Sequence, residues 1–399
     1  MIHIFLNGSA ASAGGGLTYL RNVIRQFETR DDVRVSAIVE SSLRREFSGA
    51  SNISFVDAHF SSSPALRFLQ EQAMLPRLVR ESGAGVLISA GNFALRHSPV
   101  PQILLSRNSL YTSHDFYRDL RARGAYALLL DTWIKGAIAR KSVLWAECTV
   151  APSDAFAREL SESAAHDVVT IRHGFDPEAF FAGLNPLPES ARSKLRSREN
   201  TLRLLFVSHY NYYRNFETLL RAIPLLRSSL APRRVEVIFT CEFSSARNAG
   251  AYRMGQAVRL IKQLDIGGNI VELGAIPYPM LHHVYRASHV YVTPAYAESF
   301  AHPLVEAMAC GLPVVAADRP VHREICGNAA TYFPCFSPQG LAEAVVRVAG
   351  HPAPEQLSEA ARRQSTMYSW EAHVNKLLEL AEKLADARIT KSRAAGSQG

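Results

Sequence analysis

Length, composition and charge place the chain among globular proteins. It has 399 residues, 47% of them hydrophobic and 9% aromatic, with a formal charge of +8, which excludes a disordered or fibrous chain and predicts about two domains. No apolar run reaches the roughly 18 residues of a membrane span, and the first residues lack the basic and apolar regions of a signal peptide, so we expect a cytoplasmic protein.

The first predicted element is a strand over 1–7, which runs into small residues and the glycines Gly14, Gly15 and Gly16. A helical pattern begins only at Leu17. Because glycine loses more backbone entropy on ordering than other residues, the run predicts a loop that needs positive φ or the close approach of another group. A phosphate at the N-terminus of the next helix is one such group, and a plain connector is the alternative.

Strand and helix patterns alternate through the first half of the chain, which is typical of a parallel sheet covered by helices. The predicted strands are 1–7, 33–39, 86–90, 102–106 and 146–151. A stretch rich in Pro, Ser and charged residues follows around 183–200 and is typical of a linker.

The same alternation restarts after this stretch, with predicted strands over 202–208, 235–241, 269–274, 289–294 and 313–317. The sequence therefore predicts two α/β domains with a ligand cleft between the carboxyl ends of their strands. An amphipathic helix is predicted over 370–390, followed by a disordered tail.

The most informative stretch is YVTPAYAESFAHPLVEAMACGLPVVAADRP, residues 291–320. A strand ends at Thr293, and Pro303 is suited to the first position of a short helix over 303–310. Gly311 is expected to end this helix. The free N–H groups at the start of the helix favour an anion there.

Glu298 precedes this helix and Glu306 lies in its first turn, eight positions later. Taken singly, Glu298 is explained by a solvated loop charge and Glu306 by pairing with the helix dipole. The whole setting, T-P-A-Y-A-E-S-F-A-H-P-L-V-E-A-M-A-C-G-L-P-V-V, resembles the signature of the retaining nucleotide-sugar glycosyltransferases of family 4, in which seven residues separate two glutamates. The resemblance extends along nearly the whole chain through GGGLTYLRNV, VAPSDAFAREL, IRHGFDPEAF, SHYNYYRNFETLLRAI and REICGNAATYFPCFSPQGLAEAV.

This resemblance implies the GT-B fold, an α/β architecture of two doubly wound Rossmann-like domains whose parallel sheets face a central cleft. The implied divisions are an acceptor-side domain over 1–183, a linker over 184–200, a nucleotide-sugar-binding domain over 201–369, a C-terminal helix over 370–390 that returns to the first domain, and a disordered tail over 391–399.

The resemblance also implies roles on the donor side. Glu306 is expected to accept hydrogen bonds from the ribose hydroxyls, and Glu298 to lie against the hydroxyls of the donor sugar. Arg214 is expected on the pyrophosphate, where a fixed cation stabilises the departing diphosphate; a surface arginine before a helix capped by Asn215 is the alternative. The other expected donor-binding groups are the backbone N–H groups of Phe300, Ala301 and His302 for the sugar and of Leu304 and Val305 for the phosphates, together with Gly14, Gly15, Gly16 and Gly274.

This sequence departs from the family pattern at three places. His209 stands where the family often has a second basic residue, usually an arginine. A histidine is only conditionally charged near neutral pH. His209 is nevertheless predicted to be catalytic, together with Glu298 and Arg214. The loop F-A-H-P has Ala301 and His302 where glycine and leucine are common. Arg107 and Asn108 replace the usual His-Asp or His-Asn after a strand of the first domain and are expected, with His173, on the acceptor side.

The resemblance therefore implies a retaining, hexosyltransferase-type glycosyltransferase that moves a sugar from a nucleoside diphosphate to a hydroxyl of a glycan or glycolipid acceptor, in cell-surface polysaccharide biosynthesis. No metal or other cofactor is expected, because the sequence has no D-x-D motif and its five cysteines form no C-x-x-C pair. The aromatic and basic segment 107–141 suits a lipid-linked or polysaccharide acceptor and peripheral contact with the inner face of a membrane, but an ordinary core helix pair with a basic outer face is the favoured alternative.

Other functions stay open on the sequence alone. A GT-B epimerase or an inverting transferase generally lacks the Glu298–Glu306 pair in this setting. A catalytically silent partner would bind a nucleotide sugar or glycan without turnover, and His209 with the F-A-H-P loop keeps that alternative open. Nucleic-acid binding is suggested only by the net charge and is disfavoured, because the basic residues are scattered and no binding motif occurs.

Overall fold

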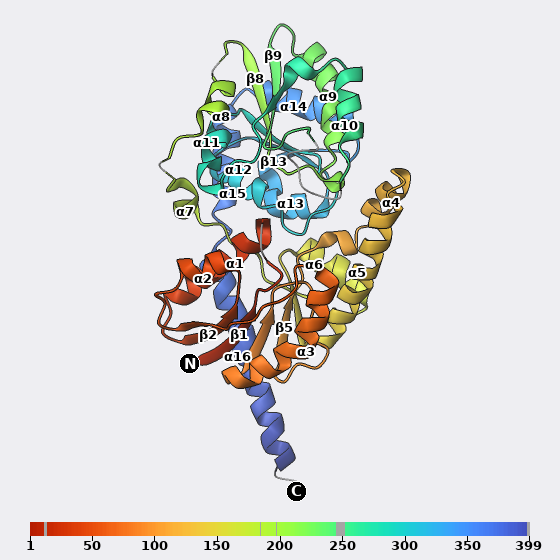
Figure 1. The fold of residues 1–399 in the computed structure, drawn as a ribbon. Helices are drawn as coiled ribbons and strands as arrows, with labels where there is room; N and C mark the ends of the chain where they lie inside the picture. Colours follow the sequence, from red (N-terminus) through yellow and green to blue (C-terminus); the bar gives the residue numbers. More distant parts are fainter. Residues whose placement is uncertain (12–13, 184, 197, 245–251, 397–399) are drawn as a thin grey trace. The chain divides into compact units, whose positions relative to one another are not determined.

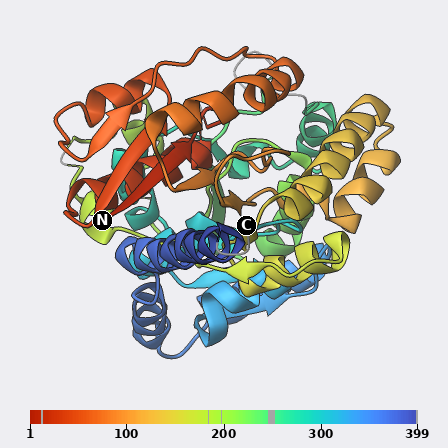
Figure 2. The ribbon, with the colours of Figure 1, turned by 90° about the horizontal axis from the view of Figure 1, so that it is seen from below.

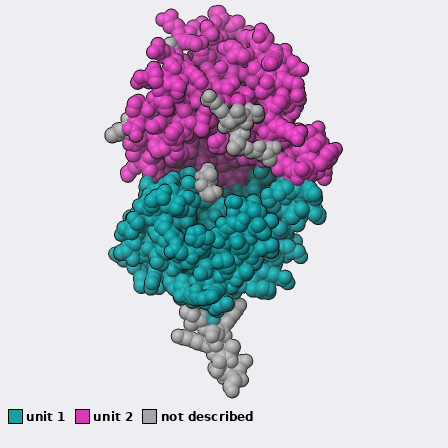
Figure 3. Space-filling view, viewed as in Figure 1, with its two compact units in different colours: residues 1–112, 130–174, 369–399 teal, residues 113–129, 175–368 magenta. Residues whose placement is uncertain are grey.

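The computed structural model describes residues 1–11, 14–183, 185–196, 198–244 and 252–396. The chain divides into two compact units, which Figures 1 and 3 show as a ribbon and in space-filling form. Unit 1 comprises residues 1–112, 130–174 and 369–399, and unit 2 comprises residues 113–129 and 175–368.

Unit 1 is built on a seven-stranded parallel sheet in the order β3-β2-β1-β4-β5-β6-β7. Its strands are β1 (Ile2–Asn7), β2 (Val33–Ile38), β3 (Ile53–Phe55), β4 (Val86–Ser89), β5 (Gln102–Leu105), β6 (Cys148–Ala151) and β7 (Val169–Thr170). The central strands are buried on both faces, which is why they appear in the sequence as continuous apolar runs. The outer strands β3 and β7 were not predicted, because two or three residues show no periodicity.

The helices of unit 1 cover both faces of this sheet. They are α1 (Gly14–Glu28), α2 (Ser41–Glu46), α3 (Pro64–Ser82), most of α5 (Tyr126–Trp145), α6 (Asp154–Ala164) and α16 (Trp370–Gly396). One core cluster joins the apolar side of α1, including Leu20 and Phe27, to Val374 and Leu377 of α16. Figures 1 and 2 show α16 beside the strands of this unit. The helix continues to Gly396, past the predicted end at residue 390, and residues 397–399 of the predicted tail lie outside the described residues.

Unit 2 contains a six-stranded parallel sheet in the order β10-β9-β8-β11-β12-β13. Its strands are β8 (Thr201–Phe206), β9 (Arg234–Phe239), β10 (Ile270–Glu272), β11 (Val290–Thr293), β12 (Val314–Ala317) and β13 (Ala330–Phe333). Its helices are α4 (His114–Ala122), α7 (Pro177–Phe181), α8 (Glu189–Lys194), α9 (Phe216–Ser229), α10 (Gly255–Gln263), α11 (Leu281–Arg286), α12 (His302–Ala309), α13 (Pro320–Cys326), α14 (Pro338–Ala349) and α15 (Pro354–Ser365). The two parallel sheets confirm the predicted α/β fold of two Rossmann-like domains.

The limits of the units differ from the domains expected from the sequence. Unit 2 takes up residues from Phe175 onward, because Phe175 and Phe180 join its core. The expected linker over 184–200 holds α8, whose Ala191 packs with Leu195 in the same core. Residues 113–129, expected in the first domain, also belong to unit 2. Across the described part of the chain, no helix is both long and apolar enough to cross a bilayer.

Candidate functional site

The strand order of unit 2 places a switch point between β8 and β11. From β8 the chain moves outward through β9 to β10 and then returns to the other side of β8 as β11. In open parallel sheets, ligands bind outside the carboxyl ends of the strands at such a point. The predicted residues His209 and Arg214 follow β8, and Glu298 follows β11, so all three lie in the segments that leave this point.

Arg214 and Glu298 meet directly. Arg214 ends the 3-10 turn Tyr212–Arg214, and its Nη1 donates to Glu298 Oε1 in a short ion pair between side chains that are 19% and 10% exposed. The two segments are also joined by Asn215, whose Nδ2 donates to Pro294 O at 3.1 Å. Arg214 Nε is buried and has no hydrogen-bond partner among the described residues. A buried donor without a partner is costly, so this guanidinium retains a site for an acceptor such as a phosphate oxygen.

Glu306 lies in α12 and is only 5% exposed. Its Oε2 accepts a hydrogen bond from the hydroxyl of Tyr285 at 2.8 Å. Burial raises the pKa of Glu306 to about 7, and the bond from Tyr285 opposes that rise. The protein thus holds a carboxyl group in an environment where its charge is costly, which is common at functional sites.

The start of α12 presents backbone rather than side chains. The side chains of Phe300, Ala301, Leu304 and Val305 all belong to the core of unit 2, so only their main-chain groups are suited to contact a ligand. The N–H of Leu304 already donates to Ala301 O at 3.0 Å, which disagrees with its predicted bond to a phosphate. His302 is half-buried, and its ring lies 4.9 Å from that of Phe300 between centroids.

Ala301 adopts φ +64° at the N-cap of α12, where the family pattern has glycine. A side chain in this left-handed region costs about 1–2 kcal/mol. Ala301→Gly is therefore expected to raise the free energy of unfolding by about 1 kcal/mol in chemical denaturation of the unliganded protein. The matched control, Ala307→Gly in the buried interior of the same helix, is expected to lower it. Destabilisation by both substitutions would contradict the strain assigned to Ala301.

Two other predicted residues of unit 2, His209 and Gly274, follow β8 and β10. His209 is exposed just beyond β8, and its carbonyl accepts from Ser208 Oγ at 2.6 Å. Gly274 follows β10, an edge strand separated from β8 by β9, and has φ +74°. This left-handed backbone favours glycine, and a Cβ atom there would also lie 3.2 Å from Glu242 Oε1.

Three further residues that interact with Glu306 or with the segments of Arg214 and Glu298 were not predicted from the sequence. Tyr285 supports Glu306, and Tyr296 bonds Tyr213 O through its N–H at 3.0 Å. His322 is fully buried; its Nδ1 is bonded to Ala317 O at 2.8 Å, and its pKa is lowered to about 4 by burial, with a smaller contribution from Arg214. No local pattern marks Tyr285 or Tyr296, because each bonds a partner distant in the sequence.

In unit 1, the predicted residues gather near the carboxyl ends of β1, β4 and β5. Gly14, Gly15 and Gly16 form the first turn of α1, and neither Gly15 nor Gly16 has positive φ, so the expected loop conformation is wrong at these positions. Residues 12 and 13, also in the expected loop, lie outside the described residues. Nothing lies within 4 Å of a Cβ built on Gly15, whereas one on Gly16 would lie 3.1 Å from Ala11 Cβ, the close approach that the sequence allowed for, and 3.9 Å from the guanidinium of Arg107.

The predicted acceptor-side residues of unit 1 are engaged within the unit. Arg107 Nη2 donates to Ala90 O at 2.6 Å, and its guanidinium lies over the Tyr19 ring, 4.3 Å from the centroid. Asn108 accepts from Leu110 N and so caps a short turn. His173 is 6% exposed, with its ring 4.9 Å from that of Tyr19. Contact of these residues with an acceptor stays a prediction.

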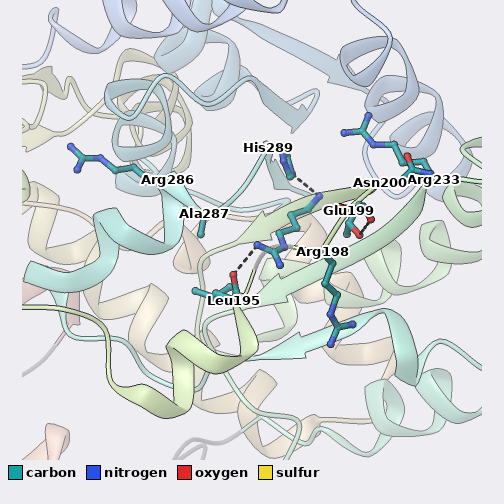
Figure 4. A pocket seen from close by; sticks show the side chains of 10 residues that line it. Leu195, Arg198, Glu199, Asn200, Arg233, Arg286, Ala287 and His289 are labelled. Atoms are coloured by element: carbon teal, nitrogen blue, oxygen red, sulfur yellow. Dashed lines mark hydrogen bonds between the residues drawn. The ribbon is translucent and has the colours of Figure 1, made fainter.

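A basic pocket of about 740 Å³ lies at the opposite, amino-terminal ends of β8 and β11. Figure 4 shows its arginines Arg198, Arg233 and Arg286 extending in different directions. Arg198 and Arg203 are already paired with the buried Glu236, at 3.0 and 3.2 Å. Because the side chains do not converge and the pocket lies at the other end of the sheet, it is separate from the site at Arg214.

In comparisons with known proteins, the family match lies within unit 2. Residues 189–364 match the model of the family described as glycosyl transferases group 1. Among curated proteins, the chain is 29% identical over 197 residues to the D-inositol 3-phosphate glycosyltransferase of Thermomonospora curvata, an alignment that covers 48% of this chain and 45% of that protein. The chain thus spans about half the length of the curated relatives it matches.

Solved structures of similar fold cover both units. Sucrose-phosphate synthase from Thermosynechococcus elongatus superposes with a TM-score of 0.73 at 17% identity, over 97% of this chain and 100% of that one. The Anabaena protein HepE in complex with UDP-glucose superposes with a TM-score of 0.68 at 16% identity, over 96% and 100% of the two chains. At these identities the likeness shows the fold alone.

Proposed function

From the match of residues 189–364 to the family described as glycosyl transferases group 1, we propose that this chain transfers a sugar from a nucleoside diphosphate to a hydroxyl acceptor with retention of the anomeric configuration. The observation that carries the proposal is the Arg214–Glu298 ion pair beyond the carboxyl ends of β8 and β11, with the buried Glu306 in the helix that follows Glu298. The UDP-glucose bound to HepE, a protein of the same fold, supports a nucleotide sugar as the donor.

Each residue has a role suited to its surroundings. Glu306, held by Tyr285, accepts hydrogen bonds from the ribose hydroxyls when it is ionised. Arg214 binds the diphosphate through its unpartnered Nε, and Glu298, its partner in the free protein, accepts hydroxyl groups of the donor sugar. The main chain at the start of α12 adds the positive end of a helix dipole.

The proposed reaction needs no nucleophile from the protein. The bond between the anomeric carbon and the diphosphate oxygen breaks as the acceptor oxygen bonds to the same face of that carbon. The proton of the acceptor hydroxyl passes to the departing diphosphate. The charge that develops on the diphosphate is met by Arg214, a preorganised cation, which is the form of stabilisation that commonly contributes most to such steps.

We further propose that no divalent metal is required, because Arg214 and the α12 dipole supply the positive charge that a metal would otherwise bring. The acceptor is proposed to be a glycan or glycolipid used in cell-surface polysaccharide synthesis. The curated relatives are named for D-inositol 3-phosphate, so this compound belongs among the acceptors tested.

The first test is calorimetric titration of the parent protein with UDP, GDP, ADP and dTDP in the absence of metal. One of these nucleotides is expected to bind, and Glu306→Ala is expected to abolish that binding. Arg233→Ala, in the basic pocket at the other end of the sheet, is the matched control and is expected to bind like the parent. Binding of none by folded parent protein would contradict the proposal.

A second measurement separates the rival functions. With the matching nucleotide sugar and an acceptor, NMR of the product is expected to show the anomeric configuration of the donor. Inversion would indicate an inverting transferase, and a changed sugar without transfer would indicate an epimerase. Donor binding without turnover on any acceptor would favour the catalytically silent partner.

A further inference from the structure

The helix α4 packs in unit 2, although the chain on both sides of residues 113–129 belongs to unit 1. Figure 3 shows this segment in the colour of unit 2. The helix starts at a cap formed by Ser113 Oγ, which accepts from Phe116 N at 3.3 Å. Phe116 and Leu120 form its fully buried side. The segment is therefore an integral part of the unit that contains Arg214 and Glu298.

A network of charged groups fastens α4 to the rest of unit 2. Asp119 Oδ1 accepts from Arg123 Nε at 2.8 Å, and Arg123 Nη1 donates to Glu217 Oε1 at 2.9 Å. The side chains of Asp119, Arg123 and Glu217 are 20%, 14% and 9% exposed. Each carboxylate also accepts from a tyrosine hydroxyl, Asp119 from Tyr296 at 2.8 Å and Glu217 from Tyr210 at 3.2 Å. Such charge-assisted bonds between largely buried groups fix geometry strongly.

The same network reaches both segments that carry the ion pair. Tyr296 stands two residues before Glu298, and its N–H donates to Tyr213 O, which adjoins Arg214. The ring of Phe116 packs edge-on against that of Tyr213, with 6.2 Å between centroids. Arg214 itself lies over the Tyr213 ring, 5.2 Å from its centroid. On the other side of the turn, Arg123 lies 4.3 Å from the centroid of Tyr212.

We propose that α4 positions the donor site, with Asp119 and Arg123 as positioning residues that hold Arg214 and Glu298 in place. The inference rests on the proposed function. Neither Arg214 nor Glu298 lies on a strand or a long helix, so the segments that carry them need support from other elements. A displacement of about 1 Å of a group that contacts the reacting atoms reduces turnover by about 100-fold. That support comes from residues 113–129, which the sequence assigned to the acceptor-side domain.

The test uses the full chain with the nucleotide sugar and acceptor that the parent accepts. Tyr296→Phe removes one hydroxyl and keeps the ring, which packs 5.1 Å from that of Phe336. Asp119→Asn weakens the same bond from the other side. Each is expected to lower kcat by about 10- to 100-fold and to leave the acceptor KM unchanged. The double variant is expected to lose little more than Asp119→Asn alone, because Tyr296→Phe removes only the Tyr296–Asp119 bond, whereas Asp119→Asn weakens that bond and the pair with Arg123.

The control variant is Arg121→Ala, an exposed residue of the same helix, which is expected to keep the kcat of the parent. Circular dichroism at the assay temperature verifies that every variant is folded. If Tyr296→Phe and Asp119→Asn have a lower Tm but the kcat of Arg121→Ala, α4 supports the fold only and this inference is overturned. Absence of turnover by both the parent and Arg121→Ala would overturn the proposed function, and this inference with it.

Discussion

Glu306→Gln is expected to abolish nucleotide binding and, at the same time, to stabilise the unliganded protein above pH 7. Burial raises the pKa of this carboxyl to about 7 from an ordinary value of 4.5, so the ionised form costs about 3 kcal/mol of folding free energy. Glutamine keeps the shape and an acceptor for the hydroxyl of Tyr285, but removes the charge. Loss of function with a gain of stability is the behaviour of a residue retained for binding.

The size of this stabilisation depends on pH. Between about pH 4.5 and 7 the folded protein binds more protons at Glu306 than the unfolded chain does. The contribution of this group to stability is therefore complete below about pH 4.5 and is lost as the pH rises to about 7. Urea denaturation of parent and variant is expected to show equal stabilities near pH 4.5 and a difference that grows to its full size at pH 8.

Binding has the opposite dependence, because ribose hydroxyls need the carboxylate as acceptor. The affinity of the parent for its nucleotide is expected to rise as the pH increases through about 7, and a nucleoside without phosphates separates this rise from titration of the ligand. A variant that binds like the parent at pH 8 would remove Glu306 from the nucleotide site. Equal stability of the two proteins at pH 8 would contradict the cost assigned to its buried charge.

Arg214→Ala is expected to lower turnover by about 100- to 1,000-fold, the usual cost of removing a preorganised group that stabilises developing charge. Binding of the nucleoside diphosphate is expected to weaken more than binding of the nucleoside, because only the former has the phosphates that Arg214 meets. Glu298→Ala is expected to reduce turnover mainly and to leave nucleotide affinity nearly unchanged. Calorimetry and initial rates measure the two effects separately.

The ion pair adds a stability effect that distinguishes these variants. Arg214→Ala leaves Glu298, 10% exposed, without its partner, which is expected to lower the free energy of unfolding by about 1–3 kcal/mol. Combining Arg214→Met with Glu298→Gln removes both charges and is expected to recover much of that loss without restoring turnover. Equal losses of affinity for nucleoside and nucleoside diphosphate in Arg214→Ala would exclude Arg214 from the phosphate site.

The sequence predicted the elements whose signals are local. Buried parallel strands such as 102–106 and 202–208 appear as apolar runs, and Pro303 and Gly311 mark the ends of α12 within one residue or two. The spacing of Glu298 and Glu306 around this helix is likewise contained in one continuous stretch. By contrast, Gly14–Gly16 were expected in a loop and form a helical turn, because the following helix outweighs the cost that glycine adds to its first turn.

The sequence by itself thus determined the two parallel sheets and the placement of Arg214 and Glu298 in segments that leave neighbouring strands. Tertiary structure alone decided that Tyr285 supports Glu306, 21 residues later, and that Asp119 accepts from Tyr296 across 177 residues. It also decided that α4 packs in unit 2 rather than with the strands on either side of it in the chain. The reason is physical: periodicity and turn residues report on neighbours within a few positions, whereas these contacts form only when buried polar groups must find partners in the folded core.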